Sequence, residues 1–358
     1  MKKSKILLCL SFVFPAVFLC SFLTSGNAQE VRVTTEMISM PTYTMGPDEK
    51  QPIFRGFSVP GMGVFRASRT TYPYPRADNF GHVREMKEYE AITLENEFIR
   101  TVVIPDLRGR LQGAYDKRNG WDFIYYNHAI KPGDIGNRAG WLAGGLEWNH
   151  PGVHGYTQFE RISSKIIEHP DGAKTVLVAE IEPVRFMKWE TAITLRPGSL
   201  AVETEGRFYS IAPFPVPFAS SLNGAMHTSE EMEAIYPEGS WVTGHGKHYV
   251  EPWPYYRGKD HSWFKNLDSR LSLFTEGCSD DFFGCYSHDK NGGTVIWGDH
   301  RTAPGKKYFS WGAHPDGRAW DELLSDEDGG YIELQVGAFW ENLGYGECMK
   351  EEVEDGFG

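Results

Sequence analysis

The chain has 358 residues, of which 41% are hydrophobic and 23% charged, so it can bury a large core and is not disordered throughout. The formal net charge of −12 excludes a nucleic-acid backbone as the partner, because phosphates require a basic surface. The content of 39 glycines, 21 prolines and many aromatic residues favours short strands joined by turns over long helices.

The N-terminal residues 1–28 predict an export signal. Lysines within the first five residues precede an apolar run from Ile6 to Leu23, and small residues follow up to Ala28. We expect cleavage after Ala28 and a protein exported to a periplasm or the extracellular space. A retained membrane anchor stays open as the alternative, because the run is long enough to span a bilayer. No later stretch has that length, so we expect no stable membrane span after signal removal.

Residues 29–90 are predicted to be an N-terminal extension that packs on the main domain. The segment from Val31 to Glu88 reads as irregular, with prolines at alternate positions in 72–75. The whole sequence shows no repeat of about 20–50 residues, so a solenoid or propeller is not supported.

Residues 91–340 are predicted to form one large all-β sandwich. Runs that alternate apolar and polar residues are separated by turn sequences such as Asp171-Gly172 and Pro197-Gly198. The expected strands lie within 91–104 (two runs around a polar turn), 174–182, 189–195, 200–209, 294–297 and 331–336. Short helical turns are expected near 229–234. Residues 341–358 form an acidic tail of low strand propensity, and both a short domain and a truncated one stay open as interpretations.

Three cysteines remain after signal removal, namely Cys278, Cys285 and Cys348. Cys278 and Cys285 are close enough in sequence to bridge a hairpin in an oxidising compartment, but buried free thiols fit equally well. No CxxC pair occurs, so a zinc site built from thiolates is not expected.

Four segments hold the residue types that perform chemistry. The first, 104–122, carries Arg110, whose guanidinium has a fixed donor fork suited to sugar hydroxyls or carboxylates. The alternative is a hairpin with surface arginines.

The second segment, 141–158, contains three polar side chains, Glu147, Asn149 and His150, and then His154, with Trp148 among them. Gly144 and Gly145 would let another chain or a ligand approach the backbone closely. A sugar site with acid–base histidines, a metal site and a structurally satisfied polar loop all stay open. No metal or other cofactor is assigned.

The third and fourth segments add further candidates. His227 follows an apolar pair and is by itself more typical of a hydrogen-bonded structural residue than of a catalyst. In 297–339, four side chains are candidates to face a polar ligand beside Trp311, namely Asp299, His300, Lys306 and Lys307.

Glu333 lies within an otherwise apolar predicted strand. Strand alternation places it on the face of Tyr331 and Gln335, opposite Ile332 and Leu334. If that face lines a concave sheet, burial would raise the pKa of the carboxyl toward working pH, which suits a general base. If the face is open to water, Glu333 is an ordinary exterior residue.

These segments resemble the bacterial domain-of-unknown-function 5107 family, whose fold is that of galactose mutarotase. The matching stretches span about 91–339 in order: LENEFIRTVVIPDLRGRLQGAYDKRNGWDFIYYN, IKPG, GWLAGGLEWNHPGVH, AIYPEG with GHGK, APGKKYFSWG and AWDELLSDEDGGYIEL. The resemblance implies a β-supersandwich with a sugar-binding concave face. It also implies that His154, His227 and Glu333 surround the sugar and that Arg110 grips it, with His150 as a competitor of His154. The family often continues into further strands and tetratricopeptide helices, which this chain lacks.

The sequence therefore predicts an exported carbohydrate-active protein. A glycoside-cleaving enzyme with Glu147 and Glu333 as its carboxylate pair is the preferred hypothesis, because oligosaccharides are met outside the cytoplasm. A mutarotase- or epimerase-like isomerase is the alternative, with Glu333 as base and His154 or His227 as acid. A non-catalytic carbohydrate-binding module also stays open. The expected partner is a carbohydrate ligand and the oligomeric state is unknown.

Overall fold

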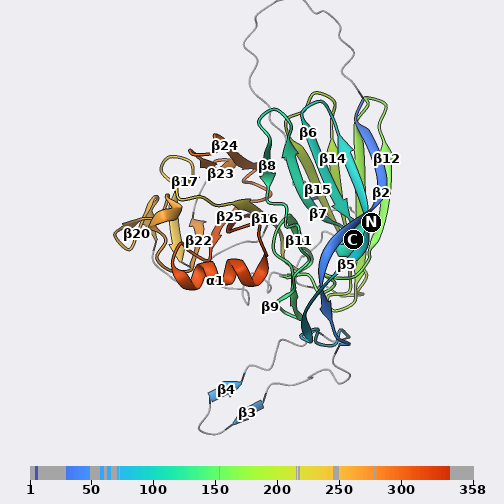
Figure 1. Ribbon diagram of the computed structural model, residues 1–358, viewed down its shortest axis with the longest axis horizontal. Coiled ribbons are helices and arrows are strands. Elements are labelled where there is room, and N and C mark those ends of the chain that lie inside the picture. Colours follow the sequence, from blue (N-terminus) through green and yellow to red (C-terminus); the bar gives the residue numbers. More distant parts are fainter. Residues whose placement is uncertain are drawn as a thin grey trace, which may run out of the picture.

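The computed structural model describes residues 5–6, 30–48, 57–59, 63–65, 71, 73–152, 154–214, 216, 218–244, 250–276 and 279–338. Within this part the chain is built almost entirely of β-strands (Figure 1). The predicted signal, the acidic tail, Cys278 and Cys348 lie outside the described residues, apart from strand β1 (Lys5–Ile6).

The centre of the molecule is a 12-stranded antiparallel sheet. Its strands follow the order β19-β18-β22-β25-β26-β16-β11-β7-β6-β5-β2, with β8 paired to β7. Their bounds in chain order are β2 (Arg32–Met45), β5 (Phe80–Glu95), β6 (Ile99–Ile104), β7 (Arg110–Asp116), β8 (Trp121–Ile124), β11 (Leu146–Asn149), β16 (Ser220–His227), β18 (Trp241–Gly244), β19 (Glu251–Pro252), β22 (Leu271–Glu276), β25 (Gly305–Ser310) and β26 (Tyr331–Ala338).

Two smaller sheets pack on one face of the large sheet (Figure 1). The first has the order β1-β15-β14-β13-β12, with β12 (Ser163–Glu168), β13 (Lys174–Glu182), β14 (Met187–Leu195) and β15 (Val202–Ser210). The second has the order β17-β23-β24, with β17 (Met232–Ile235), β23 (Phe282–Ser287) and β24 (Gly292–Trp297). The main hydrophobic core lies between these layers.

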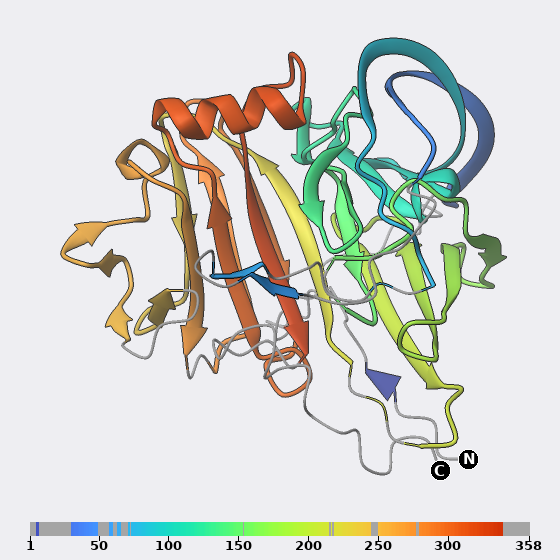
Figure 2. The same cartoon turned by 90° about the horizontal axis from the view of Figure 1, so that it is seen from below.

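The remaining elements are short. They are the pairs β3 (Phe57–Val59) with β4 (Gly63–Phe65), β9 (Gly133–Gly136) with β10 (Ala139–Trp141) and β20 (Tyr255–Tyr256) with β21 (Lys259–Asp260), the 3-10 turns Pro105–Leu107 and Phe264–Asn266, and α1 (Pro315–Leu324). Helix α1 crosses one end of the strands around β26 (Figure 2).

The alternating sequence pattern accounts for the smaller five-stranded sheet. In β14 and β15 buried and partly exposed residues alternate strictly, so one face packs on the core and the other meets solvent. The central strands β16 and β26 differ, because nearly every residue in them is buried on both faces. Polar residues in these two strands are therefore enclosed by protein.

The predicted all-β sandwich is confirmed, and β13 and the turn between β5 and β6 lie where the sequence placed them. The expectation that 31–88 is irregular is wrong for two segments, because β2 and β5 pair over nearly their whole length at the edge of the large sheet. The interpretation failed because both strands carry many charged and small polar residues on exposed faces, which weakens the apolar alternation.

Two local predictions also need correction. The segment near 229–234 leads into strand β17 instead of a helical turn, and the sequence pattern missed helix α1. Cys285 is a buried free thiol, and burial raises its pKa to about 12, so it is an inert core residue. Among the described residues, no helix has the length and apolar character needed to cross a bilayer.

Candidate functional site

A row of polar residues crosses the large sheet on the face turned away from the two smaller sheets. Residues directly opposite each other in antiparallel strands share a face. The register places side by side, from β11 through β16 and β26 to β25, Glu147, Asn223, Gln335 and Lys307. Arg110 of β7 continues the row. Leu146 is paired with Leu111 in an antiparallel ladder, so the next residue of β11, Glu147, lies opposite the preceding residue of β7, Arg110.

The opposite face of the same strands is apolar. Leu146, Leu222 and Leu334 alternate with the polar residues and belong to the main core between the sheets. Every member of the polar row is nevertheless buried. Burying a polar side chain costs free energy unless its polar atoms form hydrogen bonds with protein groups or with a ligand. The row is therefore a candidate site.

Glu147 is held by four donors. Its carboxylate accepts hydrogen bonds from the Trp141 indole (3.0 Å), Gln158 Nε2 (2.7 Å) and Asn223 Nδ2 (3.2 Å), and it lies 2.9 Å from Nδ1 of His154. Burial opposes ionisation, but the His154 ring and the Arg110 guanidinium outweigh it and hold the pKa of Glu147 well below its usual value. Glu147 is therefore an ionised carboxylate.

His154 is oriented by this carboxylate. Its Nδ1 lies within 3.0 Å of both oxygens of Glu147, and its ring lies 5.5 Å from that of Trp141. The side chain is 16% exposed, more than any other member of the group, so His154 lies where the polar cluster reaches solvent. With Nδ1 directed at Glu147, Nε2 remains to exchange a proton with a bound molecule.

Arg110 supports the loop that carries these groups. Its guanidinium donates to Gln158 Oε1 (3.0 Å), to the Leu142 carbonyl (3.0 Å) and to the Gly144 carbonyl. Gly145 must lie close to β7, since a Cβ there would stand 2.3 Å from the Leu111 carbonyl oxygen, and its φ is +64°. The close approach expected at the two glycines is thus made to the chain's own strand.

Glu333 lies on the same face, one step along β26 from the row. It is 6% exposed and accepts a hydrogen bond from Gln335 Nε2 (2.9 Å). Burial raises its pKa, with a contribution from the Glu147 charge, while Lys307 and His154 act in the opposite direction. The pKa values of two carboxyl groups on one face are thus shifted in opposite directions, that of Glu147 downward and that of Glu333 upward. Such a difference is typical of an acid–base site.

His227 shares the face but lies further along the strands. Ala225 is paired with Glu333, and His227 is paired with Tyr331. Its ring contacts those of Tyr125 (4.5 Å) and Trp121 (5.7 Å), and burial lowers its pKa to about 4. His227 is therefore neutral at pH 7 and is a poorer proton donor than a histidine paired with a carboxylate.

The structure separates two of the other predicted residues from this cluster. Trp148 and His150 lie between the sheets, where the Trp148 indole donates to the Gly109 carbonyl (2.7 Å) and His150 packs edge-on against Phe208 (4.9 Å). Burial lowers the pKa of His150 to about 3, so it is a neutral core residue and does not compete with His154. Even–odd alternation along β11 decided this outcome.

The remaining predicted residues lie at three places. Lys306 points to the opposite face from Lys307, and Trp311 donates to the Tyr331 hydroxyl (3.0 Å) at the end of β26. Asn149 is on the polar face, where it is buried without a hydrogen-bond partner. Asp299 and His300 belong to a loop after β24.

The only group of three metal-type ligands found in the described residues includes that loop. Ligand atoms of Asp281, Asp299 and His300 lie within 4.8 Å of one another. His300 is bound to Asp281 (2.7 Å) and Asp299 is bound to Arg301 (2.7 Å), so the carboxylates already have partners. These three side chains therefore give no reason to assign a metal ion to this loop.

Several members of the site were missed or only noted in passing from the sequence. They are Trp141, Gln158, Asn223 and Gln335, whereas Lys307 was a candidate and does lie in the row. A usable signal existed for two of them, since Asn223 and Gln335 are amides within otherwise apolar strands. Gln158 lies in a turn, and nothing in the local pattern indicates that it reaches Glu147.

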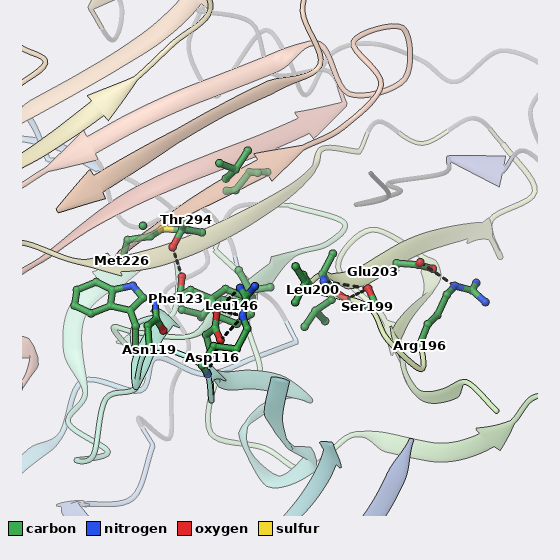
Figure 3. Close-up of a pocket in the computed structure, with 18 of the residues that line it drawn as sticks. Asp116, Asn119, Phe123, Leu146, Arg196, Ser199, Leu200, Glu203, Met226 and Thr294 are labelled. Atoms are coloured by element: carbon green, nitrogen blue, oxygen red, sulfur yellow. Dashed lines mark hydrogen bonds and ion pairs between the residues drawn. The ribbon is translucent and has the colours of Figure 1, made fainter. Parts of the chain in front are cut away.

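A cavity of about 730 Å³ lies on the apolar face of the same strands (Figure 3). Leu146, Leu222 and Met226 line it where the two smaller sheets fail to meet, and the turn 196–203 forms its rim. Arg196 on that rim is bound to Glu203 (2.8 Å). Its walls are mainly apolar, so it does not hold the proton-transfer groups described above.

The comparisons with known proteins agree with this architecture. The family model described as Domain of unknown function (DUF5107) matches residues 67–354. A TPR-domain containing protein from Parabacteroides distasonis ATCC 8503 is similar in structure, with a TM-score of 0.76, 22% identity and coverage of 87% of this chain and 52% of that chain. This chain thus spans about half of that protein's length.

Two further solved structures are more distant. The Slr1438 protein from Synechocystis sp. PCC 6803 has a TM-score of 0.51 at 13% identity and covers 72% of this chain and 89% of its own. A galactose mutarotase-like protein from Lactobacillus casei ATCC 334 has a TM-score of 0.48 at 11% identity, with coverage of 71% and 90%. The family predicted from the sequence is confirmed, and at these identities the solved structures speak for the fold alone.

Proposed function

We propose, from the premise that this chain belongs to the family described as Domain of unknown function (DUF5107), that it is a carbohydrate-active protein in which Glu333 and His154 transfer protons on a cyclic sugar. One observation carries the proposal. The pKa values of two carboxyl groups on one buried face are shifted in opposite directions, Glu147 downward and Glu333 upward, and a histidine oriented by Glu147 lies at the exposed edge.

The geometry favours an epimerase-like reaction at the anomeric centre. Glu333 takes the proton of the anomeric hydroxyl while Nε2 of His154 gives a proton to the ring oxygen. The bond between the anomeric carbon and the ring oxygen breaks, and the anomeric carbon becomes a carbonyl. After rotation about the adjoining carbon–carbon bond, the two transfers run in reverse and close the ring as the other anomer.

Glu147 supports this reaction without exchanging a proton. Its carboxylate contacts Nδ1 of His154 and fixes the orientation of the ring, so that Nε2 is directed away from Glu147. We assign the acid to His154 and not to His227, because burial keeps His227 neutral at pH 7 and no described carboxylate is bonded to its ring.

Glycoside cleavage is the second candidate. It is favoured by the presence of two carboxyl groups, Glu147 and Glu333, on one face of the sheet. It is disfavoured by the four donors on Glu147, which leave that carboxylate little capacity to act as nucleophile or base. We further propose that the protein acts after export, on the basis of the N-terminal composition.

Polarimetry tests the first proposal. Freshly dissolved single anomers of glucose, galactose and related aldoses are mixed with the purified protein, and the approach to equilibrium is followed. We expect acceleration for at least one sugar, its loss in Glu333→Gln, and its retention in Glu36→Gln, which changes an exposed carboxylate. Release of new reducing ends from an oligosaccharide panel without any catalysed mutarotation would instead support the glycosidase.

A further inference from the structure

A second polar cavity, of about 350 Å³, lies beyond the ends of β16 and β26. It is lined by Thr228 after β16, by Asp321 and Glu322 of α1, and by Gly330 before β26. None of these residues belongs to the group around Glu147 and His154.

Asp321 is the buried acid of this cavity. It lies on the inner side of the last turn of α1 and is 8% exposed. Its carboxyl accepts a hydrogen bond from the Tyr331 backbone N–H, but Oδ1 has no hydrogen-bond partner in the described structure. A buried carboxylate oxygen without a donor costs free energy, so a donor supplied by a bound molecule would stabilise the ionised form of Asp321.

Gly330 shapes the cavity around that carboxyl. A Cβ on Gly330 would stand 2.6 Å from Asp321 Oδ2 and 2.7 Å from Thr228 Oγ1. The absent side chain leaves a small space that two oxygens from different elements border. Thr228 is fixed there, because its N–H donates to the Gly330 carbonyl (3.1 Å).

The charge of the cavity is negative. The guanidinium of Arg318, which lines the cavity, forms an ion pair with Glu230 (3.1 Å). The carboxylate of Asp326 forms an ion pair with Lys131 (2.9 Å). No basic side chain of the described residues forms an ion pair with Asp321 or Glu322. Burial raises the pKa of Asp321 to about 7, against a smaller opposite effect of Arg318.

The cavity is separated from Glu333 by aromatic residues. Trp311 stacks on Trp320 (4.6 Å between ring centroids) and donates to the Tyr331 hydroxyl. Gly330 precedes Glu333 by three residues, which corresponds to roughly 10 Å along a strand. A ligand here would be a neighbour of the proton-transfer site and not a part of it.

We propose that this cavity binds the protonated amino group of a small hydroxylated molecule, such as an amino sugar. The ammonium supplies donors to Asp321 Oδ1, and hydroxyls of the ligand pair with Thr228 Oγ1. The choice of a sugar rests on the proposed function, whereas the choice of an ammonium group rests on the unpaired carboxylate alone.

Calorimetric titration with four probes tests the proposal. Glucosamine and ethanolamine carry the ammonium, whereas glucose and N-acetylglucosamine do not. We expect glucosamine to bind at least tenfold more tightly than glucose or N-acetylglucosamine, and ethanolamine to bind detectably. Asp321→Asn should weaken glucosamine binding roughly 10- to 100-fold, which is the effect of a charged hydrogen bond.

Three further variants keep the test decisive. Thr228→Val removes the hydroxyl at nearly constant volume and should weaken binding severalfold even if Asp321→Asn folds poorly. Asp316→Asn, at an exposed position of the same helix, and Glu333→Gln should leave binding unchanged. Equal binding of all four probes, or unchanged binding in both cavity variants, would overturn the proposal. Loss of binding in Glu333→Gln would place the ligand in the other site. These binding outcomes do not depend on catalysis, so they can be interpreted even if the protein does not accelerate mutarotation.

Discussion

The two faces of the central strands carry opposite chemistry on the same backbone. On one face Glu147, Asn223 and Glu333 lie within a hydrogen-bonded polar cluster. On the other face Leu146 and Leu222 border an apolar core and the cavity of about 730 Å³. The cavity of about 730 Å³ therefore lies on the face without the acid–base groups.

This difference shows that cavity size and chemical capability need not coincide in one molecule. The apolar space lies where residues of β16, the turn 196–203 and β24 border a common cavity between the large sheet and the two smaller sheets. The polar cluster arises from strand register, which brings single polar residues of five strands into one row. The first is a packing feature, and the second concentrates groups whose pKa values are shifted.

The largest expected effect belongs to the polar face. Glu333→Gln should lower the rate of catalysed mutarotation about 100- to 10,000-fold, because general acid–base groups contribute in this range. Sugar affinity, measured by titration, should stay within about tenfold of the original. A variant that keeps its rate would remove Glu333 from the mechanism.

A truncation on the apolar face should affect stability instead. Leu222→Ala is expected to lower the free energy of unfolding by about 2–3 kcal/mol, near the low end for such changes because the side chain already borders a cavity. Urea unfolding measures this, with exposed Ile181→Ala as the control expected to change it by less than about 0.5 kcal/mol. The affinity for sugar should not change. A loss of sugar binding in folded Leu222→Ala would mean that the apolar cavity takes part in recognition.

The folded protein should lose stability at low pH because Glu147 becomes protonated. Its pKa is lower in the folded than in the unfolded chain, so its stabilising contribution is present above the unfolded value of about 4.3 and is lost as the pH falls below it. We expect this group to add up to about 1.4 kcal/mol per pH unit to the slope of stability below pH 4. Glu147→Gln should flatten the slope, measured by urea unfolding between pH 6 and 3, whereas an unchanged slope would show that Glu147 is not ionised in the fold.

The smallest expected effect is a shift of the pH dependence of the mutarotation rate to higher pH. Burial raises the pKa of Glu333, and a general base must be ionised, so the rate should increase with pH through a midpoint above the value of about 4.3 for a free glutamate. Polarimetry between pH 4 and 8 would locate the midpoint. A midpoint at or below that of the free side chain would contradict the assignment of Glu333 as the buried base.

Much of the fold could be predicted from local patterns. The alternation in β13, β14 and β15 identified these strands, since each has one face on the core and one in solvent. The edge strands β2 and β5 escaped detection because exposed charged residues interrupt the apolar period. Helix α1 escaped because it is a single short helix that begins with Pro and Asp in an otherwise strand-rich chain.

The candidate site could be predicted only in part. Glu147, His154 and Glu333 were identified by residue type and by resemblance, and the structure brings them to one face. His150 was included with them because it is near His154 in sequence, yet it packs in the core between the sheets. His150 continues the alternation of β11 on the face of Trp148, opposite Glu147, but the sequence alone did not show that a strand runs up to Asn149.

The order of residues along the chain determined the strand-rich architecture, the family and the identity of the ionisable side chains, because these depend on local periodicity and composition. Only the tertiary structure decided which of those side chains meet. The register between β11, β16 and β26 joins residues up to 188 positions apart by pairing Glu147 with Asn223 and Asn223 with Gln335. Burial and the neighbouring charges then shift the pKa values of Glu147 and Glu333. Neither the alignment of distant strands nor the dielectric around a carboxyl is encoded in any single segment, so both appear only when the sheet is complete.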